Sequence, residues 1–287
     1  MDWFYIHDLL IDYGIFCIMA LGAYFTLSAH QISLGHGALA GIGGYLTAIL
    51  STNLGVPVAV SISLAALCGA LGGLIVAYFI ALRLKGMYLA IGTFAFGEAM
   101  VVLWFNWEYV GGALGFLRIP YVHNIWLIYG ILAVLTYALW SFERSTMVIA
   151  FRAAFDDEVT AASFGINVRS IKIMAWGVGG FVTALGGALF AHSLSVVRPD
   201  NFAFAFSIML LLAPCIGGFR TFWGTYLGAA VIVFLPHIVN VADPINKRIF
   251  FGLAYIALML WRPEGVIGRQ GLRLPEWLRR RNAASSS

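Results

Sequence analysis

Long apolar stretches, separated by short polar segments, follow one another along almost the whole chain. A helix needs about 20 consecutive apolar residues to cross the hydrocarbon core of a membrane. Stretches of roughly this length lie at 9–29, 34–53, 56–82, 86–106, 125–142, 173–193, 203–219, 222–240 and 249–262. Ten-residue segments of alternating polarity, the pattern of a membrane β-barrel, do not occur in the sequence. The pattern predicts an all-α, polytopic helical membrane protein with about nine transmembrane helices, in a single domain over residues 1–287.

The composition supports this prediction. Hydrophobic residues make up 61% of the chain and charged residues 10%, whereas a soluble domain carries roughly 25% charged residues. The 32 glycines indicate helices that approach one another closely, because lipid provides no hydrophobic drive for helices to associate and small residues allow close packing.

The basic residues between the predicted helices indicate how the chain is oriented. Short loops rich in Lys and Arg stay in the cytoplasm. Four basic segments fall on one side of a nine-helix arrangement: Arg83 with Lys85, the segment 143–172, Arg220 and the tail 263–287. This side is predicted to be the cytoplasm, with the C-terminus inside and the N-terminus outside. The bias is incomplete, since Arg118, Arg198, Lys247 and Arg248 fall on the outer side.

The longest polar interruption, residues 143–172, carries too many charges to lie in hydrocarbon. Three acidic residues precede apolar residues at helical spacing, and Gly165 supplies a helix stop. Acidic residues at the start and basic residues beyond the end suit a helix dipole. A solvated loop is the alternative, but the capped pattern favours a short amphipathic helix that docks on a partner. Its candidate contact residues are Asp156, Asp157, Glu158, Ala161, Ala162, Phe164 and Gly165.

Glycines gather at the start of the second predicted helix, where five lie between Gly35 and Gly44. Glycine inside a helix costs about 1 kcal/mol relative to alanine, so this segment predicts a glycine-broken second helix, with close packing as the alternative. A similar stretch at 217–230 matches it at an offset of 181 residues. In transporters, glycine-interrupted segments in corresponding positions point to the substrate path.

Glu98 is the clearest ionisable residue inside a predicted helix. A carboxylate at that depth faces the bundle interior or a cavity, so Glu98 either lines a path or ties helices together by hydrogen bonds. His36 and His192 lie near predicted helix ends, where a structural role competes with proton relay. The candidate path residues are Gly35, His36, Gly37, Glu98, Gly217 and Gly218.

Several chemical motifs are missing from the sequence. It contains no GxxxxGK[ST] phosphate-binding loop, no HExxH, no GxSxG and no CxxC pair. The three cysteines, Cys17, Cys68 and Cys215, lie in apolar runs and indicate neither a disulfide nor a metal framework. We therefore expect no catalytic residue, no metal site, no cofactor bound by this chain and no nucleic-acid partner.

Six segments, taken together and in order, resemble the M-type permease subunit of the high-affinity branched-chain amino acid ABC importers. They are QISLGHGALAGIGGYLTA, LRLKGMYLAIGTFAFGE, RAAFDDEVTAASFGINVRSIK, GGALFAHSLSVVRPDNFAFAFSI, IGGFRTFWGTYLGA and WRPEGVIGR. The similarity extends from about Ser28 to Arg269. It implies a helical permease of the bacterial inner membrane that is not itself an enzyme.

The resemblance also implies partners. These are a homologous H-type permease, two ATPase subunits that hold ATP and Mg²⁺, and a soluble binding protein outside the membrane. The family's ATPase-docking helix maps to Asp156–Gly165, within the coupling loop 143–172; Thr160 stands where the general permease pattern has Glu. The family also includes importers of urea and short amides, which leaves the solute open. A stand-alone secondary transporter and an intramembrane enzyme are the alternatives from other classes.

Overall fold

The computed structural model describes residues 3–219, 221–238 and 252. Its helices are α1 (Trp3–Ser28), α2 (His36–Ala48), α3 (Val58–Val76), α4 (Gly86–Asn106), α5 (Ile125–Glu143), α6 (Thr146–Asp156), α7 (Glu158–Ser163), α8 (Val168–Leu194), α9 (Phe204–Gly217) and α10 (Phe222–Ile238). Two π-helical turns, η1 (Ile49–Asn53) and η2 (Ala77–Ala81), extend α2 and α3. The predicted helix at 249–262 and the basic tail 263–287 lie outside the described residues, except for residue 252.

Six helices of the described part are long and apolar enough to cross a membrane. They cover Tyr5–Ser28, Val58–Ala81, Gly86–Asn106, Ile125–Glu143, Val168–Leu194 and Pro199–Gly217. The protein is therefore an all-α, multi-pass membrane protein, as the hydrophobic pattern predicts. The count of nine is not confirmed, because α2 has 13 residues and α10 has 17, and the ninth predicted helix is outside the described residues.

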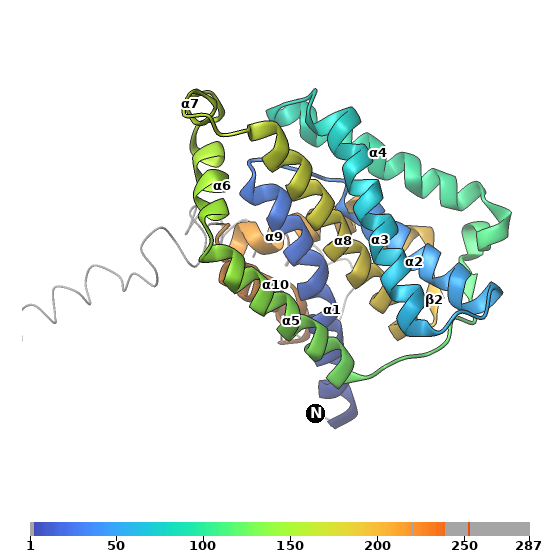
Figure 1. The fold of residues 1–287 in the computed structure, drawn as a ribbon. Coiled ribbons are helices and arrows are strands. Elements are labelled where there is room, and N and C mark those ends of the chain that lie inside the picture. The colour runs from blue at the N-terminus through green and yellow to red at the C-terminus, as the bar shows by residue number, and fades with distance from the viewer. Residues whose placement is uncertain (1–2, 220, 239–251, 253–287) are drawn as a thin grey trace, which may run out of the picture.

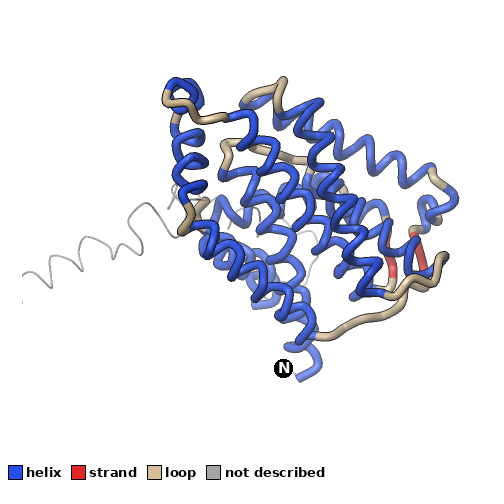
Figure 2. Tube along the Cα trace, viewed as in Figure 1, coloured by secondary structure: helices blue, strands red, loops and turns tan. Residues whose placement is uncertain are grey.

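A short antiparallel pairing is the exception to the helical fold. Strands β1 (Phe116–Leu117) and β2 (Val196–Val197) pair Phe116 with Val197 (Figure 2). Both of these side chains are buried. The pairing fastens the α4–α5 connector to the segment that follows α8.

Helix α8 forms the centre of the bundle, with α1, α2 and α3 packed against it (Figure 1). Its 27 residues span about 40 Å at 1.5 Å per residue. Small residues make the close packing possible. A Cβ added to Gly43 of α2, for example, would overlap the backbone of Ala184 in α8.

Helix α2 runs without interruption from His36 to Ala48, so the prediction of a glycine-broken second helix is wrong. Its glycines serve close contacts with α4, α8 and the turn η5 (Pro199–Phe202), which is the alternative the sequence left open. The non-helical part lies ahead of the helix, at residues 29–35, where Gln31 and Ser33 are buried.

The two ends of the bundle differ in character. Helix α1 begins at one end, marked N in Figure 1, and finishes beside α6, where the His30 ring bonds the Phe155 carbonyl at 2.6 Å. The Lys85 ammonium lies 3.3 Å from the Glu158 carboxylate of α7. The basic segments 83–85 and 143–172 therefore share the α7 end, opposite the start of α1.

Candidate functional site

The short helix predicted in the segment Asp156–Gly165 is present as α7, and its first turn is capped by Asp157. The Asp157 carboxylate accepts hydrogen bonds from the amides of Val159 and Thr160, at 2.8 and 3.2 Å, and from the Thr160 hydroxyl at 2.7 Å. The bonds from Thr160, followed by the bond from the Val159 amide, hold the pKa of Asp157 below its usual value. Capping of this kind satisfies amides that a helix start leaves without partners.

The end of α7 is shaped by Gly165, which adopts a left-handed conformation with φ of +81°. The Gly165 amide donates to the Ala162 carbonyl at 3.0 Å, and the Ile166 amide donates to the Ala161 carbonyl at 3.2 Å. These two bonds form a Schellman motif, which favours glycine at this position. The structure therefore gives the predicted stop at Gly165 a definite geometry.

Glu158 ties α7 to the membrane-spanning helices. Its carboxylate contacts Lys172 of α8 at 2.5 Å and Lys85, just before α4, at 3.3 Å. The Lys172 side chain is 6% exposed, whereas that of Lys85 is 74% exposed. Burial raises the pKa of Glu158, but the hydrogen bonds and charges of the two lysines outweigh it, so the pKa is lowered overall.

The outer surface of α7 carries apolar side chains. Val159 is 78% exposed, Phe164 is 81% exposed, and Ala162 is exposed beside them. Ala161, in contrast, is 3% exposed. The prediction that Ala161 contacts a partner therefore needs correction, since its side chain packs inside this chain.

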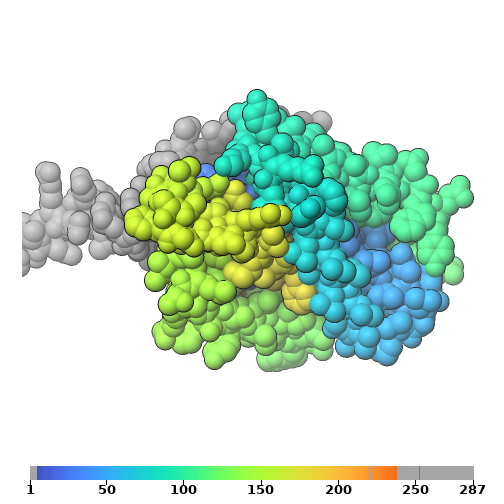
Figure 3. Space-filling model, turned by 45° about the horizontal axis from the view of Figure 1, so that its top comes forward, coloured from blue at the N-terminus to red at the C-terminus, as the bar shows by residue number. Residues whose placement is uncertain are grey.

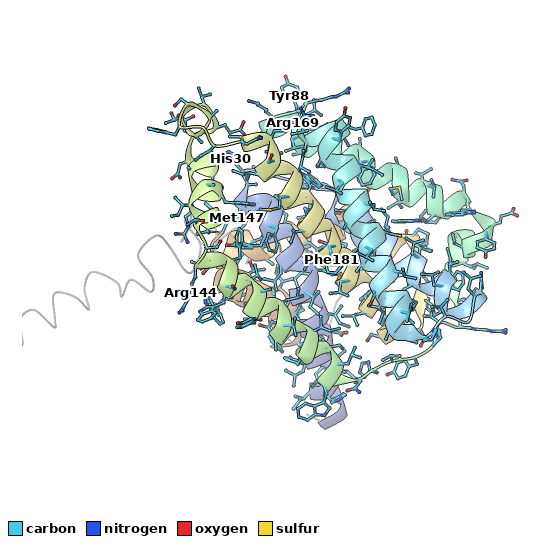
Figure 4. All side chains as sticks on the ribbon, in the orientation of Figure 1. His30, Tyr88, Arg144, Met147, Arg169 and Phe181 are labelled. Atoms are coloured by element: carbon cyan, nitrogen blue, oxygen red, sulfur yellow. The ribbon has the colours of Figure 1, made fainter. Side chains whose placement is uncertain are left out.

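A surface hollow lies close to α7. It has a volume of about 370 Å³ and is lined by Tyr78, Leu82, Arg83, Val168, Arg169 and Lys172. In the space-filling view, the yellow start of α8 lies against the cyan end of α3 at this position (Figure 3). Arg169 and Tyr88 extend from the same end of the bundle (Figure 4). Cationic and apolar groups thus meet beside α7.

A second group of predicted residues meets near the middle of the bundle, where α2 and α9 both begin. The Gly37 amide of α2 donates to the Ser207 hydroxyl of α9 at 2.9 Å. The Glu98 carboxylate of α4 accepts from the Phe204 amide, the first residue of α9, at 3.1 Å. Gly35 packs beside Thr93 and Gly97 of the same helix α4. The structure therefore brings Gly35, Gly37 and Glu98 close together, and their role in a substrate path stays a prediction.

His36 lies in the same region but is fully buried. Its Nε2 atom bonds the Thr26 hydroxyl at 3.2 Å, and its ring stacks on Trp176 with centroids 5.7 Å apart. Its Nδ1 atom has no hydrogen-bond partner among the described residues. These contacts match a histidine that joins α1, α2 and α8.

Gly217 and Gly218 do not join this group, because they lie at the opposite end of α9. Gly217 packs against the backbone of Gly224, and Gly218 turns the chain into α10 with φ of +110°. Sequence reasoning missed Ser207, which acts through its side-chain hydroxyl, and Phe204, which acts through a backbone amide of the kind that every helix start offers. No residue pattern marks such partners in advance.

Comparison with known proteins identifies the family of the chain. Residues 5–259 match the family described as branched-chain amino acid transport system / permease component. The chain belongs to this family. It is 27% identical to the high-affinity branched-chain amino acid transport system permease protein LivM of Escherichia coli K12, over 88% of this chain and 68% of LivM. The corresponding protein of Salmonella typhimurium gives the same values.

Other relatives of the permease are named as parts of a different import system. The autoinducer 2 import system permease protein LsrC of Enterobacter sp. strain 638 is 25% identical, over 77% of this chain and 65% of LsrC. No solved structure matches the permease. Its membership in a family of transport permeases makes it a component of a membrane transport system of the ABC importer class.

Proposed function

We propose that this chain is the transmembrane permease subunit of an ATP-binding-cassette importer for branched-chain or related amino acids. The observation that carries the proposal is α7, a capped helix with exposed Val159 and Phe164 that is joined to α8 through Glu158. The sequence holds no phosphate-binding loop, so the work of transport comes from another subunit. A helix with an apolar outer surface fits a groove on such a subunit.

The basic residues at the α7 end indicate how the chain is oriented in the membrane. The α7 end carries Arg83, Lys85, Arg169 and Lys172, and basic segments of this kind face the cytoplasm. The start of α1 then faces outward across the bacterial inner membrane. ATP and Mg²⁺ belong to the two cytoplasmic ATPase subunits, and a binding protein delivers the solute from outside.

The apolar surface that α4 and α9 turn away from the bundle fits the second permease subunit. Lipid surrounds the remaining apolar surface of the helices. On α4, Met87, Tyr88, Ile91 and Val102 are more than half exposed, and Phe204 and Met209 of α9 continue this apolar surface. Phe94 and Phe204 pack edge to face across the two helices, with centroids 4.7 Å apart. A homologous H-type subunit placed there encloses a path between the two chains.

Glu98 and the helix starts give this path its chemistry. A helix N-terminus attracts anions, and in transporters the starts of short helices point at the carboxylate of the substrate. Glu98 supplies the opposite charge beside the first amide of α9, at 3.1 Å. An amino acid carries both an ammonium and a carboxylate, so this pairing of charges suits a zwitterion better than it suits a neutral solute.

A neutral solute is the second candidate, because some relatives are autoinducer 2 permeases and the wider family includes urea and amide importers. Uptake by the complex in sealed vesicles separates the candidates. Labelled leucine is expected to accumulate with the binding protein outside and ATP inside. Accumulation of urea but not leucine would favour the neutral solute. Leucine accumulation that needs an ion gradient and no ATP would instead indicate a secondary transporter.

A further inference from the structure

The outer end of the bundle brings together three side chains that can hold a metal ion. His7 and Asp8 lie near the start of α1, and His123 lies in the connector just before α5. One ligand atom from each of these residues lies within 4.8 Å of the other two. More than a hundred residues separate the two parts of this group in the sequence, so the fold alone creates it.

The distances between the ligand atoms fit a small divalent ion. The Asp8 carboxylate lies 2.9 Å from the His123 Nε2 atom and 3.6 Å from the His7 Nδ1 atom. Tetrahedral Zn²⁺ with bonds near 2.0–2.1 Å holds its ligand atoms roughly 3.3 Å apart. Two imidazoles and one carboxylate form a known zinc ligand set, with a fourth position left to water.

The contacts that the His123 ring makes with Ser193 and Tyr121 also favour metal binding. Its Nδ1 atom lies 3.2 Å from the Ser193 hydroxyl, at the end of α8. When Nδ1 carries the hydrogen and donates it to Ser193, Nε2 keeps its lone pair and faces Asp8. Metal-binding histidines are regularly oriented by a hydrogen bond at the second ring nitrogen. The Tyr121 ring stacks on His123, with centroids 5.4 Å apart, and restricts the imidazole further.

The three side chains differ in exposure, and this difference lets an ion enter from solvent and then stay bound. The His123 side chain is 14% exposed and that of His7 is 33% exposed, whereas that of Asp8 is 63% exposed. The histidines are therefore largely held by the protein, and the carboxylate faces the solvent from which an ion arrives. Asp12, one helical turn beyond Asp8, adds negative charge on the same face of α1.

We propose that His7, Asp8 and His123 bind one Zn²⁺ ion on the outer side of the permease. The bound ion joins the start of α1 to the α4–α5 connector and, through Ser193, to the end of α8. This proposal does not depend on the transported solute or on the ATPase contact. It differs from the expectation of no metal site, which rested on cysteine spacing and on contiguous motifs.

Zinc binding to the full-length permease tests the proposal. The protein is purified without a polyhistidine tag, stripped with a chelator, and titrated with Zn²⁺ in competition with a fluorescent chelator. One ion is expected per chain. His7→Ala, His123→Ala and the size-matched Asp8→Asn are each expected to weaken binding at least tenfold. His237→Ala is the control, since His237 bonds Tyr5 at the same end of the bundle and is expected to leave the affinity unchanged.

A second measurement keeps the result independent of folding defects. Co²⁺ in a tetrahedral site absorbs in the visible range, and this absorption is expected in the wild-type protein and in His237→Ala. Loss of the absorption is expected in Asp8→Asn, which changes an exposed side chain. Ser193→Ala is expected to weaken Zn²⁺ binding about tenfold through the second ring nitrogen. Wild-type affinity in both His7→Ala and His123→Ala, or no Zn²⁺ binding at all, would overturn the proposal.

Discussion

The Glu98 carboxylate of α4 accepts a hydrogen bond from the Phe204 amide, 3.1 Å away, at the start of α9. Glu143, at the end of α5, does the same for the Phe222 amide at the start of α10, at 3.2 Å. Each carboxylate thus satisfies an amide that a helix start leaves unpaired. The two sites differ in place, because Glu98 lies beside the start of α2 and Glu143 lies at the α7 end.

This pair provides a matched test of the substrate path. Glu98→Gln keeps an oxygen that can accept from Phe204 but removes the charge. We expect amino acid uptake to fall at least about tenfold, the loss of one charged hydrogen bond to substrate. Glu143→Gln makes the same change at α10 and is expected to keep most of the uptake. Equal uptake in the two variants, measured in vesicles at matched permease content, would assign Glu98 a purely structural role.

The two lysines around Glu158 are expected to differ in their effect on α7. Lys172→Met removes a charged hydrogen bond in which the lysine is buried, with its side chain 6% exposed, and we expect a loss of about 2 kcal/mol in the stability of the α7 contact. Lys85→Met removes a partner that is 74% exposed, and such pairs contribute about 0–1 kcal/mol. Hydrogen–deuterium exchange of α7 amides measures the difference. Faster exchange in Lys85→Met than in Lys172→Met would contradict the assignment.

Acid is expected to loosen α7. The pKa values of Asp157 and Glu158 are lowered in the folded protein, so both carboxylates stabilise α7 fully above their unfolded pKa values near 4. The contribution is lost as the pH falls through the lowered folded values. A spin label at Ser163 is expected to keep constant mobility from pH 8 to pH 5 and to become mobile below about pH 4. In the double variant Asp157→Asn/Glu158→Gln, the label is expected to be mobile already at pH 7.

Substitutions of the α2 glycines are expected to destabilise the packing of the helices, and any effect on transport follows from this. A Cβ on Gly37 would overlap the Ser207 hydroxyl and lie 2.6 Å from the Phe202 carbonyl, so even Gly37→Ala forces the packing to shift. We expect a loss of about 1–3 kcal/mol, the typical cost of overpacking. Gly130→Ala in α5 is the control, since no atom lies within 4 Å of its added Cβ. The midpoints of thermal unfolding of the two variants in detergent check this expectation. An unchanged midpoint in Gly37→Ala would contradict the close contact of Gly37 with Ser207 and Phe202.

The sequence predicted the features that depend on local pattern. The apolar stretches gave the six long helices, and the acidic start and Gly165 gave the position and ends of α7. The charge pattern placed residues 83–85 and 143–172 together, as the contact between Lys85 and Glu158 shows. These features are encoded in neighbouring residues, so a single sequence reveals them.

The sequence could not predict what depends on the approach of distant backbones. The glycines at positions 37 and 43 are compatible both with a broken helix and with a close helix contact. Only the packed structure distinguishes these two possibilities. The burial of Ala161 depends on the position of α7 against the rest of the chain, which its own sequence does not contain. The joining of His7, Asp8 and His123 likewise depends on how α1 packs against the connector.

The central claim is that α7 carries the contact between this permease and its ATPase. Gly165→Val tests it well, because an added Cβ meets no atom within 4 Å and the substitution acts through the left-handed backbone, at a cost of about 1–2 kcal/mol. Gly55→Val is the matched control, with φ of +62° and equally open space in a turn away from α7.

The deciding measurement is the amount of ATPase that stays bound to the purified, solubilised permease in these two variants. The account predicts that Gly165→Val loses most of its ATPase and that Gly55→Val retains it, with equal amounts of permease in the membrane. Full retention of the ATPase by Gly165→Val would contradict the account, since it would show that α7 is a connector and not the coupling contact.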